Sequence, residues 1–196
     1  MRVSRLVFLA VVVAVLGVAA GTIHLTKPAW YERLWYPLRY QQIVDGHARN
    51  YRLDPALLAA VIYEESKFHA DARSRSGAIG LMQLLPATAL GIATRTGGTR
   101  FQVSDLYNPE LNVRYGAWYL RHLLDKYGDE RLALAAYNAG QHNVDRWRRK
   151  GEGIAFPETR HYVDRVEDLK RIYRDVYGSR LRPTALRHLT DAKVMS

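Results

Sequence analysis

A glutamate within an apolar helix is the first residue of this chain that could do chemistry. Asp54 followed by Pro55 is typical of a helix start, because aspartate caps free backbone N–H groups and proline fits the first helical position. At about 100° per residue, Glu65 falls near the centre of the apolar side of this predicted helix, whereas Glu64 projects toward its rim. The apolar side is formed by Leu57, Leu58, Val61, Ile62 and Phe68.

The two glutamates are therefore expected to differ in environment. Apolar surroundings disfavour the ionised form of a carboxyl group and raise its pKa, which makes Glu65 a candidate proton donor near neutral pH. The alternative is a structural role, in which Glu65 pairs with an arginine or caps a neighbouring helix. The helix alone does not decide between the two.

Around this helix the sequence predicts a mainly α-helical domain. Asn108-Pro109 repeats the cap-and-proline signal, and Gly128 and Gly178 follow the ends of apolar periodic segments. No segment has a convincing strand pattern, and no internal repeat is present. The predicted helices cover residues 36–51, 54–68, 86–94, 108–128, 129–140, 144–149 and 157–178, with irregular segments at 69–80 and 94–105.

Composition limits the classes of partner and site. The 196 residues include no cysteine, which excludes disulfides, thiolate metal sites and a cysteine nucleophile. The seven histidines lack a paired spacing, so no metal site is predicted. A net charge of +10 favours an anionic neighbour, which could be nucleic acid, phospholipid or a cell-wall polymer. The basic run 146–150 is expected to be a solvated helix face.

The pattern of residues at the N-terminus predicts that the protein is exported. Arg2 and Arg5 precede an uncharged apolar run over residues 6–23, which is about long enough to cross a bilayer. Its length favours an uncleaved anchor over a signal peptide cleaved after Ala20. The aromatic residues of the next segment, 27–39, form either a belt at the membrane interface or a surface that packs onto the domain. Export argues against nucleic acid as the partner.

Three polar clusters carry a family resemblance. Glu65-Ser66, Gly80-Leu81-Met82-Gln83 and Ala136-Tyr137-Asn138-Ala139-Gly140 are followed by Glu158-Thr159-Arg160 with Tyr162-Val163. In this order and spacing they resemble the motifs of the soluble lytic transglycosylase (SLT) family over residues 40–178. The resemblance implies a lysozyme-like fold related to goose-type lysozyme. It also implies cleavage of the β-1,4 bond between N-acetylmuramic acid and N-acetylglucosamine in peptidoglycan, leaving a 1,6-anhydro end.

The implied chemistry needs one acid and no cofactor. Glu65 would protonate the leaving glycosidic oxygen, and the substrate's 2-acetamido group would stabilise the oxocarbenium charge. The resulting carboxylate would then take the proton of the C6 hydroxyl as that oxygen attacks C1. Ordinary glycosidases use two carboxylates, but here the nucleophile belongs to the substrate.

The resemblance also implies roles for the other motif residues. Tyr137 would donate a hydrogen bond to Glu65, and Ser74 and Gln83 would bind substrate hydroxyl and acetamido groups. Met82, with Leu81, would offer apolar surface to the substrate, and Asn138 would bond backbone at a helix end.

These roles have simpler alternatives. Glu158 would lie near the stem peptide of the product, or else cap the last helix. Core packing is the alternative for Met82, and local backbone hydrogen bonding is the alternative for Ser66.

Two other functions remain open at this stage. One is a hydrolase of the goose-lysozyme type, and the other is a non-catalytic helical module that binds the cell wall. The expected organisation is an anchor or signal segment over 1–26, an aromatic linker over 27–39, the SLT domain over 40–178 and a basic tail over 179–196. We expect a monomer in the extracytoplasmic cell envelope, with glycan strands as substrate.

Overall fold

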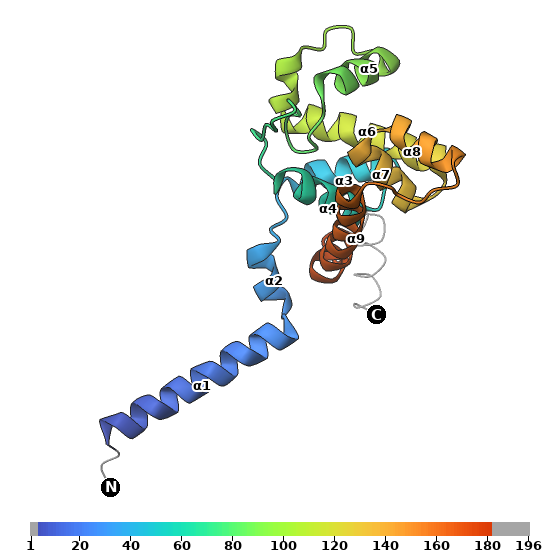
Figure 1. The fold of residues 1–196 in the computed structure, drawn as a ribbon. Coiled ribbons are helices and arrows are strands. Elements are labelled where there is room, and N and C mark those ends of the chain that lie inside the picture. The colour runs from blue at the N-terminus through green and yellow to red at the C-terminus, as the bar shows by residue number, and fades with distance from the viewer. Residues whose placement is uncertain (1–3, 182–196) are drawn as a thin grey trace, which may run out of the picture. The chain divides into compact units, whose positions relative to one another are not determined.

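The computed structural model describes residues 4–181, in two units that divide after Pro37. The first unit contains helices α1 (Arg5–Thr26) and α2 (Ala29–Trp35) (Figure 1). Within α1, Val7–Thr26 has a mean hydropathy of 2.4, so its length and composition suit a membrane span or a signal helix. The predicted 27–39 linker is not wholly irregular, because α2 occupies most of it. Arg2 and residues 182–196 of the basic tail lie outside the described residues.

The second unit is built from helices only, which confirms the mainly α fold. Among the described residues there are no strands, and the isolated bridges Arg73–Ile79 and Ile79–Leu84 are the only β pairing. The elements are α3 (Gln41–Asn50), α4 (Pro55–Ser66), α5 (Pro86–Thr96), the 3₁₀ helix η1 (Val103–Tyr107), α6 (Pro109–Tyr127), α7 (Glu130–Ala139), α8 (Gln141–Arg149) and α9 (Pro157–Tyr177).

Helix starts follow local chemistry. Asp54 accepts a hydrogen bond from the Ala56 N–H (2.9 Å), and Asp129 accepts one from the Leu132 N–H (2.8 Å). Asn108 caps α6 in the same way, and proline occupies the first position of α4, α5, α6 and α9. Where the sequence lacks such a cap, the observed helix start differs from the predicted one. The helix predicted over 36–51 begins at Gln41, and the one predicted over 144–149 begins at Gln141.

Helix α4 forms the centre of the core, and it is buried on all sides. Every residue from Ala56 to Ile62 is buried, including Ala59 and Ala60, which the predicted apolar side did not contain. The prediction of a one-sided amphipathic helix is therefore wrong. The small alanines let neighbouring helices approach closely, and α9 makes the most extensive contact with α4 (Figure 1).

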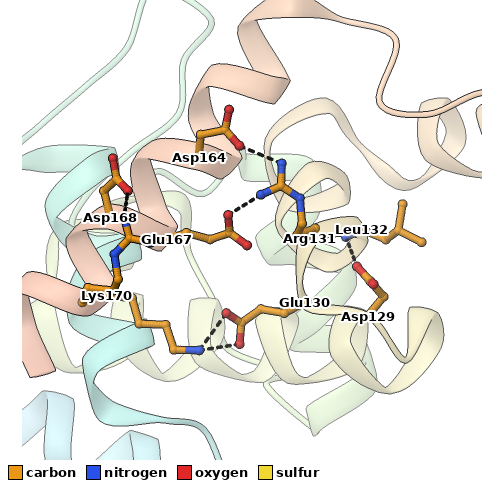
Figure 2. A network of polar contacts seen from close by, with 9 residues as sticks. Asp129, Glu130, Arg131, Leu132, Asp164, Glu167, Asp168 and Lys170 are labelled. Carbon is orange, nitrogen blue, oxygen red and sulfur yellow. Dashed lines mark hydrogen bonds and ion pairs between the residues drawn. The ribbon is translucent and has the colours of Figure 1, made fainter.

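Ion pairs attach α9 to the starts of α4 and α7. Figure 2 shows Arg131 between Asp164 (2.7 Å) and Glu167, and Lys170 on both carboxylate oxygens of Glu130 (2.7 Å each). Lys170 also lies 3.8 Å from Asp54, the cap of α4, which pairs in turn with Arg174 (2.6 Å). Exposed pairs contribute little energy one by one, so these contacts add only modestly to the packing of α9 against α4 and α7.

Candidate active site

The last turn of α4 opens into a cleft of about 410 Å³. Glu65 is the only α4 residue that lines this cleft. Six of the seven predicted site residues lie together on its wall, from four different parts of the chain. Its lining residues are Glu65, Ser74, Ser76, Ala78, Gln83, Leu84, Leu85, Thr88, Tyr119, Tyr137, Asn138, Ala139, Gly140 and Glu158.

The carboxyl of Glu65 is poised to carry a proton near neutral pH. Its pKa is raised from 4.5 to about 7, chiefly because burial penalises the charged form and, to a smaller degree, because Glu64 is nearby. Two contacts act in the opposite direction. The Tyr162 hydroxyl donates a hydrogen bond to Glu65 Oε1 (2.7 Å), and Lys67 provides a positive charge.

The prediction that Tyr137 donates to Glu65 is wrong. The Tyr137 hydroxyl donates instead to the backbone carbonyl of Met82 (2.8 Å), and Tyr162 on α9 takes the predicted role. Burial raises the pKa of both tyrosine hydroxyls well above the usual value, and the negative charge of Glu65 adds to this, so both remain protonated donors. Tyr137 still lines the cleft.

We expect Tyr162→Phe to lower kcat about tenfold and to move the alkaline limb of the pH–rate profile upward. The hydrogen bond stabilises the Glu65 carboxylate, so its loss raises the Glu65 pKa, and one such bond is worth about 1.4 kcal/mol or a factor of ten. Initial rates measured against pH test this. Tyr137→Phe is the matched variant, since its hydroxyl bonds a carbonyl and its loss should leave the limb in place. An unshifted limb in Tyr162→Phe would contradict the assignment.

The turn that carries Gln83 is held by backbone geometry that permits few substitutions. Gly80 has φ +82°, and a Cβ at this position would lie 2.4 Å from the carbonyl oxygen of Leu106. Gln83 itself has φ +46°, and its Nε2 donates to the carbonyls of Gly80 (2.9 Å) and Ala72 (3.2 Å). These two bonds fix the side-chain amide at the cleft wall.

Ser74 lies in a short loop and lines the cleft. Its hydroxyl accepts a hydrogen bond from the Ala78 N–H (3.0 Å) and lies 2.8 Å from the hydroxyl of Ser76. Ser76 lines the cleft as well. The paired hydroxyls therefore present a polar edge to the cleft, as the Ser74 prediction requires.

Met82 and Leu81 do not reach the cleft. Both are fully buried (0% exposed), so the prediction that their side chains offer surface to a substrate is wrong. A Cβ on Gly116 of α6 would lie 2.3 Å from the Met82 sulfur, which shows how closely the methionine packs in the core. The core-packing alternative holds for Met82. The apolar residues of the turn that do line the cleft are Leu84 and Leu85.

Two polar residues differ in detail from their predictions. Asn138 was predicted to bond backbone at a helix end, whereas its Oδ1 accepts a hydrogen bond from the hydroxyl of Thr159 (2.8 Å), which connects α7 to α9. Glu158 does not cap α9: Phe156 is the capping residue and Pro157 the first helical one, which leaves the Glu158 side chain exposed at the cleft. The Ser66 hydroxyl makes the expected local bond to the carbonyl of Ile62 (3.1 Å) and a shorter, non-local one to the carbonyl of Leu81 (2.8 Å).

Glu64 lies outside the cleft lining. Its carboxylate pairs with Lys67 (3.0 Å) and lies 3.7 Å from Arg165, and its side chain is 20% exposed. It is thus more enclosed than predicted, but its position is that of a structural ion pair. Within residues 4–181 no group of three or more histidine or acidic side chains could hold a metal ion.

Sequence reasoning missed Tyr119, Thr88 and the function of Tyr162. Tyr162 offered a usable signal: a tyrosine on the core-facing side of the last predicted helix must find a hydrogen-bond partner for its buried hydroxyl. Tyr119 and Thr88 gave none, because their exposure to the cleft depends on how α5 and α6 pack.

Comparison with known proteins identifies the family. The model of the family described as the transglycosylase SLT domain matches residues 42–156. This chain belongs to that family. A putative soluble lytic murein transglycosylase of Haemophilus influenzae is 33% identical over 154 residues, covering 72% of this chain and 26% of the relative. The membrane-bound lytic murein transglycosylase F of Yersinia pestis is 40% identical over 108 residues. The match covers 52% of this chain and 20% of that relative.

A solved SLT structure supports the same relationship. The 70 kDa soluble lytic transglycosylase of Escherichia coli superposes with a TM-score of 0.70 and 28% identity, covering 76% of this chain and 26% of that one. The chain thus spans about a quarter of the length of such relatives. The part they share is the helical domain that contains Glu65.

Proposed function

We propose that this protein is a peptidoglycan lytic transglycosylase that cleaves the β-1,4 bond between N-acetylmuramic acid and N-acetylglucosamine and leaves a 1,6-anhydromuramoyl end. The observation that carries the proposal is the Glu65 carboxyl, whose pKa is raised to about 7 and which Tyr162 orients at the wall of a polar cleft. Family membership supports this activity.

Glu65 acts in turn as acid and base. With a pKa of about 7, a large fraction of Glu65 is protonated at neutral pH, and it gives its proton to the glycosidic oxygen as the C1–O bond breaks. The substrate's acetamido group stabilises the positive charge at C1. The Glu65 carboxylate, which accepts from Tyr162, then takes the proton of the C6 hydroxyl while that oxygen bonds to C1. Atoms balance without water, and Glu65 returns to its protonated form.

The remaining cleft residues position the strand. Ser74, Gln83 and Asn138 bind sugar hydroxyl and acetamido groups, with their own hydrogen bonds fixing their orientation. Tyr137 lines the cleft and holds the Met82 carbonyl, so it supports the Gln83 turn. Glu158 extends from the first turn of α9 and contacts the stem peptide.

Product analysis distinguishes this reaction from hydrolysis. Glu158 is a second carboxylate in the cleft lining, which a goose-lysozyme type of hydrolase would use to activate water. Digesting purified peptidoglycan in water enriched in heavy oxygen, followed by mass spectrometry, separates the routes. We expect anhydro ends, lighter than reducing ends by one water, with no label incorporated. Labelled reducing ends would show a hydrolase, and unaltered peptidoglycan a non-catalytic wall-binding module.

The domain organisation and location complete the proposal. We assign residues 1–26 to an uncleaved membrane anchor, 27–39 to an interfacial segment, 40–178 to the catalytic domain and 179–196 to a basic tail, in a monomer of the extracytoplasmic envelope. The apolar span Val7–Thr26 supports the anchor. A mature N-terminus at Gly21, found by sequencing the native protein, would contradict it.

A further inference from the structure

A second hollow adjoins the cleft between α5 and α6. Its volume is about 200 Å³, and Thr88 and Tyr119 line both it and the larger cleft. Gln141, the first residue of α8, closes one side and lies with its Nε2 3.5 Å from the Tyr119 hydroxyl. The two hollows therefore form one continuous surface, with the ring of Tyr119 at the border.

The two parts of this surface differ in their ionisable side chains. The cleft lining contains two carboxylates, Glu65 and Glu158, and no basic side chain. The lining of the second hollow contains Arg95 and no carboxylate. A ligand that spans both parts would thus meet acidic groups at the reaction centre and a cation beyond Tyr119.

Arg95 is held in place without being neutralised. Its Nη1 donates to the carbonyl of Gly91 one turn earlier in α5 (3.0 Å), which fixes the guanidinium against the helix. In the part of the chain that the structure describes, Arg95 forms no ion pair, and its side chain is exposed. An anchored, solvent-accessible guanidinium is well suited to pair with a carboxylate.

Flat rings provide the other half of the hollow. The indole of Trp118 and the imidazole of His122 lie parallel, with their centroids 5.5 Å apart and an interplanar angle of 3°. Both residues line the hollow from α6, facing Arg95 of α5. Aromatic side chains with a few placed polar groups are typical of sites that bind a ring and fix its orientation.

We propose that this hollow is an additional subsite of the glycan-binding surface, in which Arg95 pairs with a carboxylate carried by muramic acid while the sugar ring packs against the Trp118 side. This inference rests on the proposed transglycosylase function. The carboxylate has two sources in peptidoglycan: the lactyl group of a peptide-free muramic acid, or the stem peptide attached to it. Both offer the same bidentate acceptor to a guanidinium.

Arg95→Met tests the subsite in the full chain, because methionine retains an aliphatic side chain and removes the charge. We expect KM for soluble peptidoglycan strands to rise about three- to tenfold with kcat unchanged, since the contact is the same in ground and transition states. Arg95→Lys should recover part of the affinity. Arg100→Met, at an exposed arginine in the loop after α5, is the matched control and should retain the wild-type KM.

Binding in the inactive Glu65→Gln background identifies the recognised group. Peptide-bearing strands and peptide-free strands should both lose affinity when Arg95→Met is added, and the larger loss shows which carboxylate is used. Chitin oligosaccharides of equal length carry no carboxylate, so their affinity should not change. An equal loss for chitin, or an unchanged KM with peptidoglycan, would overturn the subsite. If the wild-type protein releases no product at all, the proposed function fails instead.

Discussion

Glu65→Gln is expected to lower kcat on peptidoglycan by at least about 10³-fold. The glutamine cannot give a proton to the glycosidic oxygen or take one from the C6 hydroxyl, and proton transfer of this kind is typically worth about 10² to 10⁴ in rate. Both steps of the proposed reaction use Glu65, so the loss lies toward the upper part of this range. Release of soluble anhydro-muropeptides, followed by chromatography, measures the effect.

Glu64→Gln is the matched control for this variant. The two substitutions replace a carboxyl by an amide at adjacent positions of α4, but Glu64 does not line the cleft and pairs with Lys67. We expect it to retain most of the activity. Because the negative charge of Glu64 raises the Glu65 pKa, its removal should lower that pKa and move the alkaline limb of the profile to lower pH. Comparable losses in both variants would contradict the assignment of Glu65.

Misfolding can be separated from lost chemistry, because Glu65→Gln should make the protein more stable at alkaline pH. Glu65 has a folded-state pKa of about 7 against an ordinary value of 4.5, so the folded protein binds the proton more tightly than the unfolded chain. Stability therefore falls as pH rises between these values, by about 3 kcal/mol when both states are ionised. Thermal melts at pH 4 and pH 8 should show a gain for Glu65→Gln only at pH 8. A less stable variant at pH 8 would contradict the raised pKa.

Signals within one helix predicted much of the fold. Asp54-Pro55, Asn108-Pro109 and Asp129 each mark a helix start through a cap that needs only the next few residues, and all three lie where expected. The sequence also predicted a raised pKa for Glu65, which burial does produce, but the cleft that Glu65 lines is polar rather than apolar. Where such signals are weak, the predicted helix starts differ from the observed ones, as for α3 at Gln41 and α8 at Gln141.

Contacts between elements that are far apart in the sequence could not be predicted from such local signals. Tyr162 reaches Glu65 across 97 positions of the chain, because α9 packs along α4 more extensively than any other pair of elements does. Tyr137 is nearer to Glu65 in the sequence, but its hydroxyl donates to the Met82 carbonyl instead. Met82 shows a second limit. In a turn with positive φ at Gly80 and Gln83, the step from core to cleft falls between Met82 and Gln83, and no regular period predicts it.

The Gln83 turn depends on one buried side chain, which leads to the largest expected effect on stability. Asn112 of α6 is fully buried (0% exposed), and its Oδ1 accepts from the Met82 N–H (2.8 Å). Its Nδ2 donates to the carbonyls of Ile79 (2.9 Å) and Leu106 (2.8 Å). One side chain thus satisfies three backbone groups from the turn and from η1 through bonds that are all buried.

We expect Asn112→Ala to cost about 3 to 5 kcal/mol of unfolding free energy, because each buried backbone group left without a partner costs about 1 to 3 kcal/mol. Urea unfolding measures the change. Asn143→Ala is the matched control in α8. This asparagine is only partly buried, and it donates to one backbone carbonyl (2.8 Å) and accepts from the Arg146 side chain (2.8 Å), so its loss leaves no fully buried backbone group unpaired and should cost about 1 kcal/mol. Equal costs would show that the turn does not depend on Asn112. In the fraction that remains folded at low temperature, activity should also fall, since the same contacts position the Met82 carbonyl for Tyr137 and the Gln83 amide for the substrate.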